Sequence, residues 1–143
     1  MQDFLSHEDT RLSFKDGQRV LIEGKSGSGK SSILDAVVWC LYGKGRVDNR
    51  NLVRQTGKKA TVELTLKDGG REFRVIRKAT NDGKNTLSVE ELGDADFAPI
   101  PVAGAKNIQD WIEKELVKAS YQLFINSVSY PQDNAENFVK QVA

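Results

Sequence analysis

The segment from residue 24 to residue 31 constrains the fold of this chain more than any other. It reads Gly-Lys-Ser-Gly-Ser-Gly-Lys-Ser and matches the phosphate-binding pattern G-x-x-x-x-G-K-[ST] at every fixed position. Residues 19–23 before it have an apolar centre that predicts a short strand, and residues 32–42 after it predict a helix. Because a strand, a glycine-rich loop and a helix form the context that this motif requires, we predict a P-loop.

The residue types of this P-loop each have a chemical reason. Glycines allow the backbone to curl until successive N–H groups point inward at phosphate oxygens, and the start of the helix adds unpaired N–H groups. Lys30 is predicted to reach the β- and γ-phosphates of ATP, and the Ser31 hydroxyl to bind Mg²⁺. The predicted nucleotide-binding residues are Gly24, Lys25, Ser26, Gly27, Ser28, Gly29, Lys30, Ser31 and Ser32. The expected cofactors are therefore ATP and Mg²⁺.

Composition places the chain among ordinary one-domain proteins. Its 143 residues carry a net charge of +1, which gives no overall attraction to nucleic acid. Cys40 is the one cysteine, so no internal disulfide can form, and its apolar surroundings predict a core residue in a reducing cytosol. The first fourteen residues lack the apolar run of a signal peptide, and no stretch is long enough to span a bilayer. These features predict a cytoplasmic protein without a membrane partner.

Hydrophobic periodicity predicts the remaining elements. A hairpin is expected over residues 10–23, while residues 1–7 are too short to form an element alone. Gly43 is expected to end the helix that begins at Lys30. The later elements are three antiparallel strands around 62–66, 73–78 and 86–91, a loop over 93–105, helices over 108–117 and 120–127, an extended segment over 128–133 and a helix start over 134–142. The predicted fold class is therefore α/β, a P-loop NTPase with an antiparallel β meander.

Several separated stretches together resemble one family. They are Phe-Leu-Ser-His-Glu-Asp-Thr at 4–10, Gly-Lys-Ser-Ser-Ile-Leu-Asp-Ala at 29–36, Leu-Tyr-Gly at 41–43 and Phe-Ile-Asn-Ser-Val-Ser-Tyr-Pro-Gln at 124–132. This combination resembles the N-terminal ATPase lobe of SbcC, the bacterial counterpart of the eukaryotic break-repair ATPase Rad50. That family belongs with the SMC proteins among the ABC-type ATPases, and the resemblance covers nearly the whole chain.

The resemblance implies how such a chain works. Residues 1–143 would form the N-terminal lobe of an ABC-type head whose two lobes are joined through a long coiled coil. Two heads, a homodimer, sandwich two ATP molecules and control an SbcD-type nuclease at DNA ends. The expected partners are thus the C-terminal lobe of the same head, a second head, the nuclease and DNA.

By position, Gln132 resembles the Q-loop glutamine of this family, which contacts Mg²⁺ and the attacking water near the γ-phosphate. Lys30 and Gln132 are therefore the expected catalytic residues, and Ser31 and Gln132 the expected metal ligands. Gln132 follows Lys30 by 102 residues. This gap is longer than in transporter ATPases of the ABC class, which favours the SbcC and SMC side.

The chain also departs from the family pattern. Ser26 stands where SbcC-like chains usually have asparagine, and only three residues precede Phe4 where the family has a strand. The Asp-Glu pair and the Leu-Ser-Gly-Gly signature of the C-terminal lobe are absent, as are the coiled coil and its cysteine hook. We therefore expect a fragment or one half of a split head, which hydrolyses ATP only within a complete dimeric head and is inactive alone.

Three other interpretations remain open at this point. The chain could be an SMC- or RecN-like chromosome ATPase head, an ABC transporter ATPase subunit, or a non-hydrolysing ATP- or DNA-binding module. Residues 44–59 hold six basic residues and one acidic residue, a net charge of +5. This run is a solvated loop, a wall near the nucleotide base as in SbcC-like heads, or a contact for DNA phosphates. His7 is predicted to be structural rather than catalytic, and Trp39 and Trp111 to lie in the core or at an interface.

Overall fold

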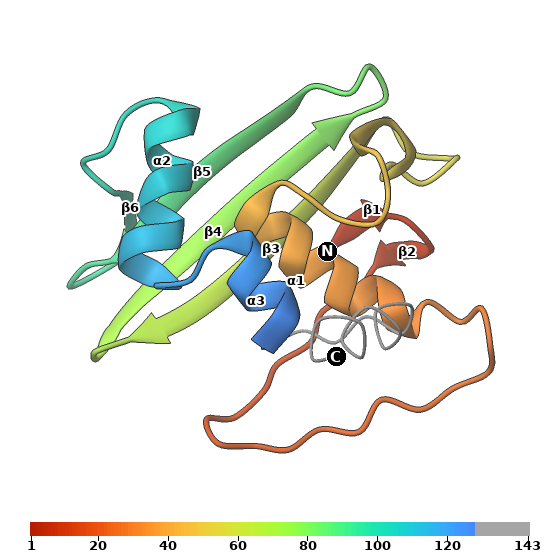
Figure 1. Ribbon diagram of the computed structural model, residues 1–143, viewed down its shortest axis with the longest axis horizontal. Helices are drawn as coiled ribbons and strands as arrows, with labels where there is room; N and C mark the ends of the chain where they lie inside the picture. Colours follow the sequence, from red (N-terminus) through yellow and green to blue (C-terminus); the bar gives the residue numbers. More distant parts are fainter. Residues whose placement is uncertain (128–143) are drawn as a thin grey trace, which may run out of the picture.

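The computed structural model describes residues 1–127 and contains one sheet with helices packed against it (Figure 1). The elements in chain order are β1 (Gln2–Phe4), β2 (His7–Asp9), α1 (Lys30–Tyr42), the 3₁₀ helix η1 (Asn49–Asn51), β3 (Lys59–Asp68), β4 (Arg71–Thr80), β5 (Asn85–Leu92), β6 (Phe97–Pro99), α2 (Ala105–Trp111), the π-helical segment η2 (Ile112–Leu116) and α3 (Tyr121–Ser127). The mixed α/β composition agrees with the sequence prediction.

Six strands form the sheet in the order β2-β1-β3-β4-β5-β6, and all neighbouring strands run antiparallel. The three long strands β3, β4 and β5 lie at the positions that alternation of apolar and polar residues predicts. The paired residues Val62–Arg77 and Val75–Val89 show their register. Helices α1, α2 and α3 cover one face of this sheet (Figure 1). The sheet is therefore dry on one face and wet on the other.

The core lies between this dry face and α1. Val62, Phe73 and Val75 of the sheet are buried against Trp39 and Cys40 of the helix. The Cys40 sulfur lies 3.5 Å from the carbonyl oxygens of Val62 and Val75, which can share its one hydrogen, and burial raises the pKa of this thiol to about 12. The prediction that Cys40 is a core residue is confirmed, as is the burial of Trp39.

The carboxyl end of α1 is closed by three donors. Gly43 adopts a left-handed conformation (φ 64°) and ends the helix as predicted, its N–H donating to the Trp39 carbonyl at 2.7 Å. Arg77 Nε donates to the Cys40 carbonyl, and Gln109 Nε2 to the Leu41 carbonyl, each at 2.9 Å. Arg77 is only 4% exposed, and its burial lowers the pKa of the guanidinium to about 10. Sheet and α2 are thereby fastened to the end of α1.

The strand predicted over residues 19–23, with its hairpin partner over 10–14, is wrong for this structure. Residues 10–29 form a long loop that leaves the body of the molecule (Figure 1), and Leu21 is 81% exposed. One turn survives, in which Gln18 N–H donates to the Lys15 carbonyl at 3.1 Å. A strand needs neighbours for its backbone groups and cover for its apolar side chains, and a lone hairpin is marginal in water. Among residues 1–127, no element supplies either to this segment.

Short segments at both edges of the sheet also correct the sequence prediction. Residues 1–9 form the hairpin β1–β2, joined to β3 through the pair Gln2–Thr61, so a short strand that ends at Phe4 is present. The predicted loop over 93–105 contains β6, whose Pro99 pairs with Glu90 at the sheet edge, where proline is tolerated.

The amphipathic helix predicted over 108–117 becomes α2 followed by η2. The predictions for 128–133 and 134–142 lie outside the described residues.

Candidate nucleotide-binding site

The P-loop lies directly before α1 and leaves the start of this helix open. Gly27 (φ 78°) and Gly29 (φ 88°) take left-handed conformations that residues with a side chain adopt at a cost, which lets the loop turn tightly. Gly29 is the N-cap of α1, and no side chain caps the helix there. Ser32 N–H donates to the Gly29 carbonyl at 3.0 Å, whereas the N–H groups of Lys30 and Ser31 at the helix start have no intrahelical partner and are available to an anion.

Lys30 holds the loop together from the inside. Its ammonium donates to the carbonyls of Gly24 at 2.6 Å and Lys25 at 2.7 Å, with the Ser28 hydroxyl at 3.5 Å. A phosphate oxygen competes well for such a donor because charge-assisted hydrogen bonds are the stronger ones. The loop thus provides N–H groups, a positive charge on a long side chain and the Ser31 hydroxyl, which is a donor set suited to a polyphosphate with Mg²⁺.

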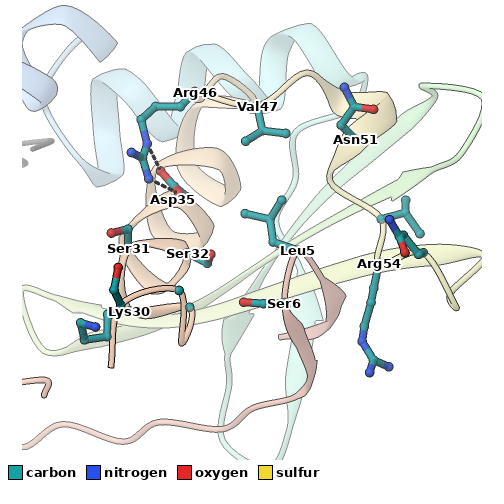
Figure 2. A pocket seen from close by; sticks show the side chains of 15 residues that line it. Leu5, Ser6, Lys30, Ser31, Ser32, Asp35, Arg46, Val47, Asn51 and Arg54 are labelled. Carbon is teal, nitrogen blue, oxygen red and sulfur yellow. Dashed lines mark hydrogen bonds and ion pairs between the residues drawn. The ribbon is translucent and has the colours of Figure 1, made fainter. Parts of the chain in front are cut away.

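A cavity of about 930 Å³ opens beside this loop (Figure 2). Its volume is within the range of ligand pockets in proteins. Two walls face each other across the cavity, the P-loop with the first turns of α1 on one side and residues 46–55 on the other, with the turn of the β1–β2 hairpin between them. The lining residues are Leu5, Ser6, Ser26, Gly27, Gly29, Lys30, Ser31, Ser32, Asp35, Arg46, Val47, Asn51, Val53, Arg54 and Gln55.

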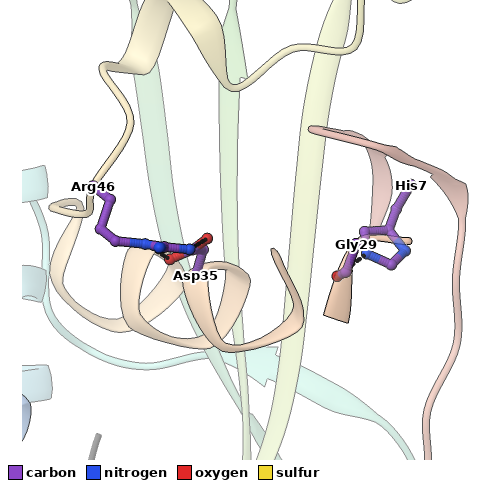
Figure 3. Close-up of polar contacts among 4 residues, drawn as sticks. All are labelled: His7, Gly29, Asp35 and Arg46. Atoms are coloured by element: carbon purple, nitrogen blue, oxygen red, sulfur yellow. Dashed lines mark hydrogen bonds and ion pairs between the residues drawn. The ribbon is translucent and has the colours of Figure 1, made fainter. Parts of the chain in front are cut away.

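The wall over residues 46–55 is fastened to α1. Arg46 makes a two-pronged ion pair with Asp35 (Figure 3), with Nε to Oδ1 at 3.0 Å and a terminal nitrogen to Oδ2 at 2.7 Å. Farther along the helix, Trp39 Nε1 donates to Asn49 Oδ1 at 2.8 Å. Only part of the basic run over 44–59 faces the cavity. Arg46 and Arg54 line it, whereas Arg50 and the three lysines of the run do not.

The β1–β2 hairpin contacts both walls. Leu5 N–H donates to the Leu52 carbonyl at 2.8 Å, and Arg54 N–H donates to the Asp3 carbonyl at 2.8 Å. On the other side, His7 Nε2 lies 3.0 Å from the Gly29 carbonyl oxygen of the P-loop (Figure 3). His7 thus has a structural contact, as predicted, but sequence reasoning did not connect it to the P-loop. The Ser-His pair in the 4–10 stretch was the signal that could have done so.

The structure brings the predicted P-loop residues together and adds residues of the hairpin turn and of 46–55 to the site. Ser26, Gly27, Gly29, Lys30, Ser31 and Ser32 line the cavity, whereas Gly24, Lys25 and Ser28 shape the loop behind it. Gln132 lies outside the described residues, so its predicted role stays a prediction. Within residues 1–127, no group of three His, Cys, Asp or Glu side chains could hold a metal ion. A Mg²⁺ here would need phosphate oxygens beside the Ser31 hydroxyl.

A P-loop that faces a cavity of this size defines a nucleotide-binding protein of the P-loop NTPase class. Comparison with known families agrees, because residues 1–142 match the family described as AAA domain, and the chain belongs to that family. Among residues 1–127, no helix has the length and apolar character needed to cross a bilayer.

Curated proteins similar to this chain are break-repair ATPases and a nuclease subunit. The chain is 32% identical over 144 residues to the DNA double-strand break repair Rad50 ATPase of Thermoplasma acidophilum, covering 96% of this chain and 15% of that protein. It is 30% identical over 140 residues to the Rad50 ATPase of Methanocaldococcus jannaschii, covering 97% and 13%. It is 30% identical over 131 residues to the SbcC component of the SbcCD nuclease of Deinococcus radiodurans, covering 87% and 14%. The resemblance to the N-terminal ATPase lobe of SbcC and Rad50 is thereby confirmed, although the chain spans about a seventh of these relatives' length.

Proposed function

We propose that this chain is the ATP-binding half of an ABC-type ATPase head that acts in DNA double-strand-break repair. The observation that carries the proposal is the P-loop at the open start of α1, facing a cavity of about 930 Å³. The names of the similar proteins support the biological setting, since they are repair ATPases and a component of the SbcCD nuclease. They favour this function over a chromosome head, a transporter ATPase or a non-hydrolysing module.

The chemistry is phosphoryl transfer to water, in which the protein mainly positions groups and stabilises charge. The loop N–H groups and the Lys30 ammonium hold the phosphates, and the Ser31 hydroxyl helps to hold Mg²⁺. Gln132 would contact the metal and the attacking water, because a neutral amide can both accept and donate. Mg²⁺ supplies charge neutralisation at the phosphates when it is bound.

Hydrolysis needs more than this chain in the proposal. The catalytic carboxylate and the signature loop would come from the C-terminal lobe of the same head and from a second head, which together close over ATP. An SbcD-type nuclease and DNA are the further partners, and the cytoplasm is the proposed location. The chain purified alone should therefore bind ATP without turning it over.

The substitution Lys30→Ala tests the binding site. Loss of a charged hydrogen-bond donor should weaken ATP binding at least about tenfold, measured by titration with a fluorescent ATP analogue. The fold should survive, because the side chain ends at the cavity. Lys15→Ala is the matched control, since it removes the same charge from the exposed loop away from the cavity. Equal affinity of Lys30→Ala and the parent chain would refute the site, and steady hydrolysis that depends on Lys30 would refute the half-site.

A further inference from the structure

One carbonyl of the P-loop, that of Gly29, accepts a hydrogen bond from outside the loop. It accepts from Ser32 N–H at 3.0 Å, within the first turn of α1, and lies 3.0 Å from His7 Nε2 (Figure 3). A carbonyl can only accept, so Nε2 of His7 carries the hydrogen and donates it. Both acceptor positions of the Gly29 oxygen are therefore used, one by the helix and one by the hairpin.

The other ring nitrogen of His7 is held by Thr10. Nδ1 lies 2.9 Å from Thr10 Oγ1. In a neutral imidazole with hydrogen on Nε2, Nδ1 has a free lone pair, so the threonine hydroxyl donates to it. Thr10 is itself fixed, because its N–H donates to the Met1 carbonyl at 2.9 Å. The Gly29 carbonyl, which can only accept, selects the tautomer, and the Thr10 hydroxyl fits it by donating to Nδ1 and thereby holds the ring in place.

The contact sets the direction of the next N–H group. The peptide bond between Gly29 and Lys30 is planar and trans, so the Lys30 N–H points opposite to the Gly29 carbonyl. Fixing that carbonyl on the His7 side turns the Lys30 N–H away from the hairpin. This N–H belongs to the first residue of α1 and has no partner within the helix.

The fit between hairpin and loop is tight. A Cβ atom on Gly29 would overlap the Ser6 hydroxyl oxygen and lie 2.9 Å from His7 Nε2. The hairpin that carries both side chains is anchored elsewhere, by pairing with β3 and by the bond from Leu5 N–H to the Leu52 carbonyl. His7 therefore projects from a supported element, which is what a group that orients another group requires.

We propose that His7 is a positioning residue for phosphate binding, which locks the Gly29–Lys30 peptide so that the Lys30 N–H faces the phosphates of the nucleotide. Thr10 acts with it by holding the orientation of the ring. The proposal rests on the nucleotide-binding function proposed above and adds to it a residue outside the P-loop.

Three variants of the whole chain test this role. His7→Leu removes the donor, Thr10→Val removes the hydroxyl that fixes the ring, and His7→Gln keeps an N–H donor at a similar reach. We expect ATP affinity to fall about threefold to tenfold in His7→Leu, as for the loss of one ordinary hydrogen bond, and by a smaller factor in Thr10→Val. His7→Gln should restore most of the affinity. Melting of each variant without nucleotide, and the ¹⁵N signal of Nε2–H in the parent chain, are measured alongside.

The outcomes separate this role from a structural one. Rescue by His7→Gln, with little change in the melting temperature of the variants that bind weakly, supports positioning. Parent-like ATP affinity of His7→Leu, or a His7→Gln variant as weak as His7→Leu, overturns it. If His7→Leu does not fold, Thr10→Val decides, and a ring without hydrogen on Nε2 overturns the role directly. Failure of the parent chain to bind ATP would overturn the proposed function and this inference together.

Discussion

The two ends of α1 differ in whether the fold supplies hydrogen-bond partners for their backbone groups. At the carboxyl end, the carbonyls of Trp39, Cys40 and Leu41 each accept a hydrogen bond from a residue fixed by the fold. At the amino end, Gly29 offers no side-chain cap, and the contact that His7 makes there is to a carbonyl. The closed end stabilises the fold, whereas the open end keeps its N–H groups for a ligand.

The dipole of α1 also favours opposite charges at its two ends. Arg77 places a positive charge at the carboxyl end, where the dipole is negative. The phosphates proposed for the amino end would bring negative charge to the positive end of the dipole. In the proposed function, one helix would therefore have a buried protein cation at one end and a bound anion at the other, so changes at the two ends should be separable by experiment.

Removing the buried cation should have the largest effect on stability. Arg77→Ala leaves the Cys40 carbonyl and the Gln109 side chain without their donor and opens space in the core, which should lower the free energy of unfolding by about 2–4 kcal/mol. Arg74→Ala on the wet face of the same strand, where the ion pair with Glu90 is partly exposed, should cost less than about 1 kcal/mol. Urea unfolding measures both. Equal losses would show that Arg77 at the carboxyl end of α1 contributes no more to stability than an ion pair on the wet face.

The same substitution at both ends of α1 sharpens the comparison. Gly43→Ala places a side chain at a left-handed residue, with its Cβ 2.7 Å from an Arg77 nitrogen, and should cost about 1–2 kcal/mol of stability without changing ATP affinity. Gly29→Ala should instead act mainly on ATP affinity, because its Cβ overlaps the Ser6 side chain of the hairpin at the P-loop. Thermal melting and nucleotide titration of both variants decide. A loss of ATP affinity in Gly43→Ala would contradict the separation of the two ends.

A smaller effect is expected at alkaline pH near the closed end. Burial, and then the negative charge of Glu113, raise the pKa of Tyr42 to about 12, and burial raises that of Cys40 likewise. Each group therefore holds its proton more tightly in the folded chain than in the unfolded chain. Their contribution to stability is complete below the ordinary pKa values and is lost as pH rises through about 12.

Unfolding of the parent chain between about pH 8 and pH 11 tests this expectation. The Tyr42→Phe and Cys40→Ala variants, which lack the titrating proton, should show a shallower decline in stability with pH. An unchanged slope in both variants would show that other groups govern the alkaline limit.

Sequence patterns were sufficient where the structure is local. The thirteen residues of α1 run from Lys30 to Tyr42, and Gly43 caps the helix, as helical spacing and a terminal glycine predict. The β3, β4 and β5 strands alternate apolar and polar residues and are separated by glycine turns, so their positions agree with the prediction, although each strand extends beyond the predicted range at both ends. The P-loop itself is a contiguous motif and needed no tertiary information.

Patterns were insufficient where a residue depends on distant partners. Residues 19–23 have the composition of a strand but no neighbour within the described chain, so propensity alone misled. The bond from His7 to Gly29 spans 22 residues and the ion pair of Asp35 with Arg46 spans 11, and neither spacing has a signature. The wall over 46–55 could be recognised only as a basic run, because its approach to the P-loop is set by packing against α1.

The order of contacts along the chain also has a kinetic consequence. The β3–β4 and β4–β5 pairs join neighbouring segments, whereas the β1–β2 hairpin reaches Leu52 and Thr61 across most of the first half of the chain. Contacts between distant residues close late because loop closure costs entropy first. We therefore expect the refolding chain to regain its sheet before the hairpin settles on the P-loop. In a stopped-flow experiment, circular dichroism should recover ahead of the binding of a fluorescent ATP analogue, and simultaneous recovery would contradict this order.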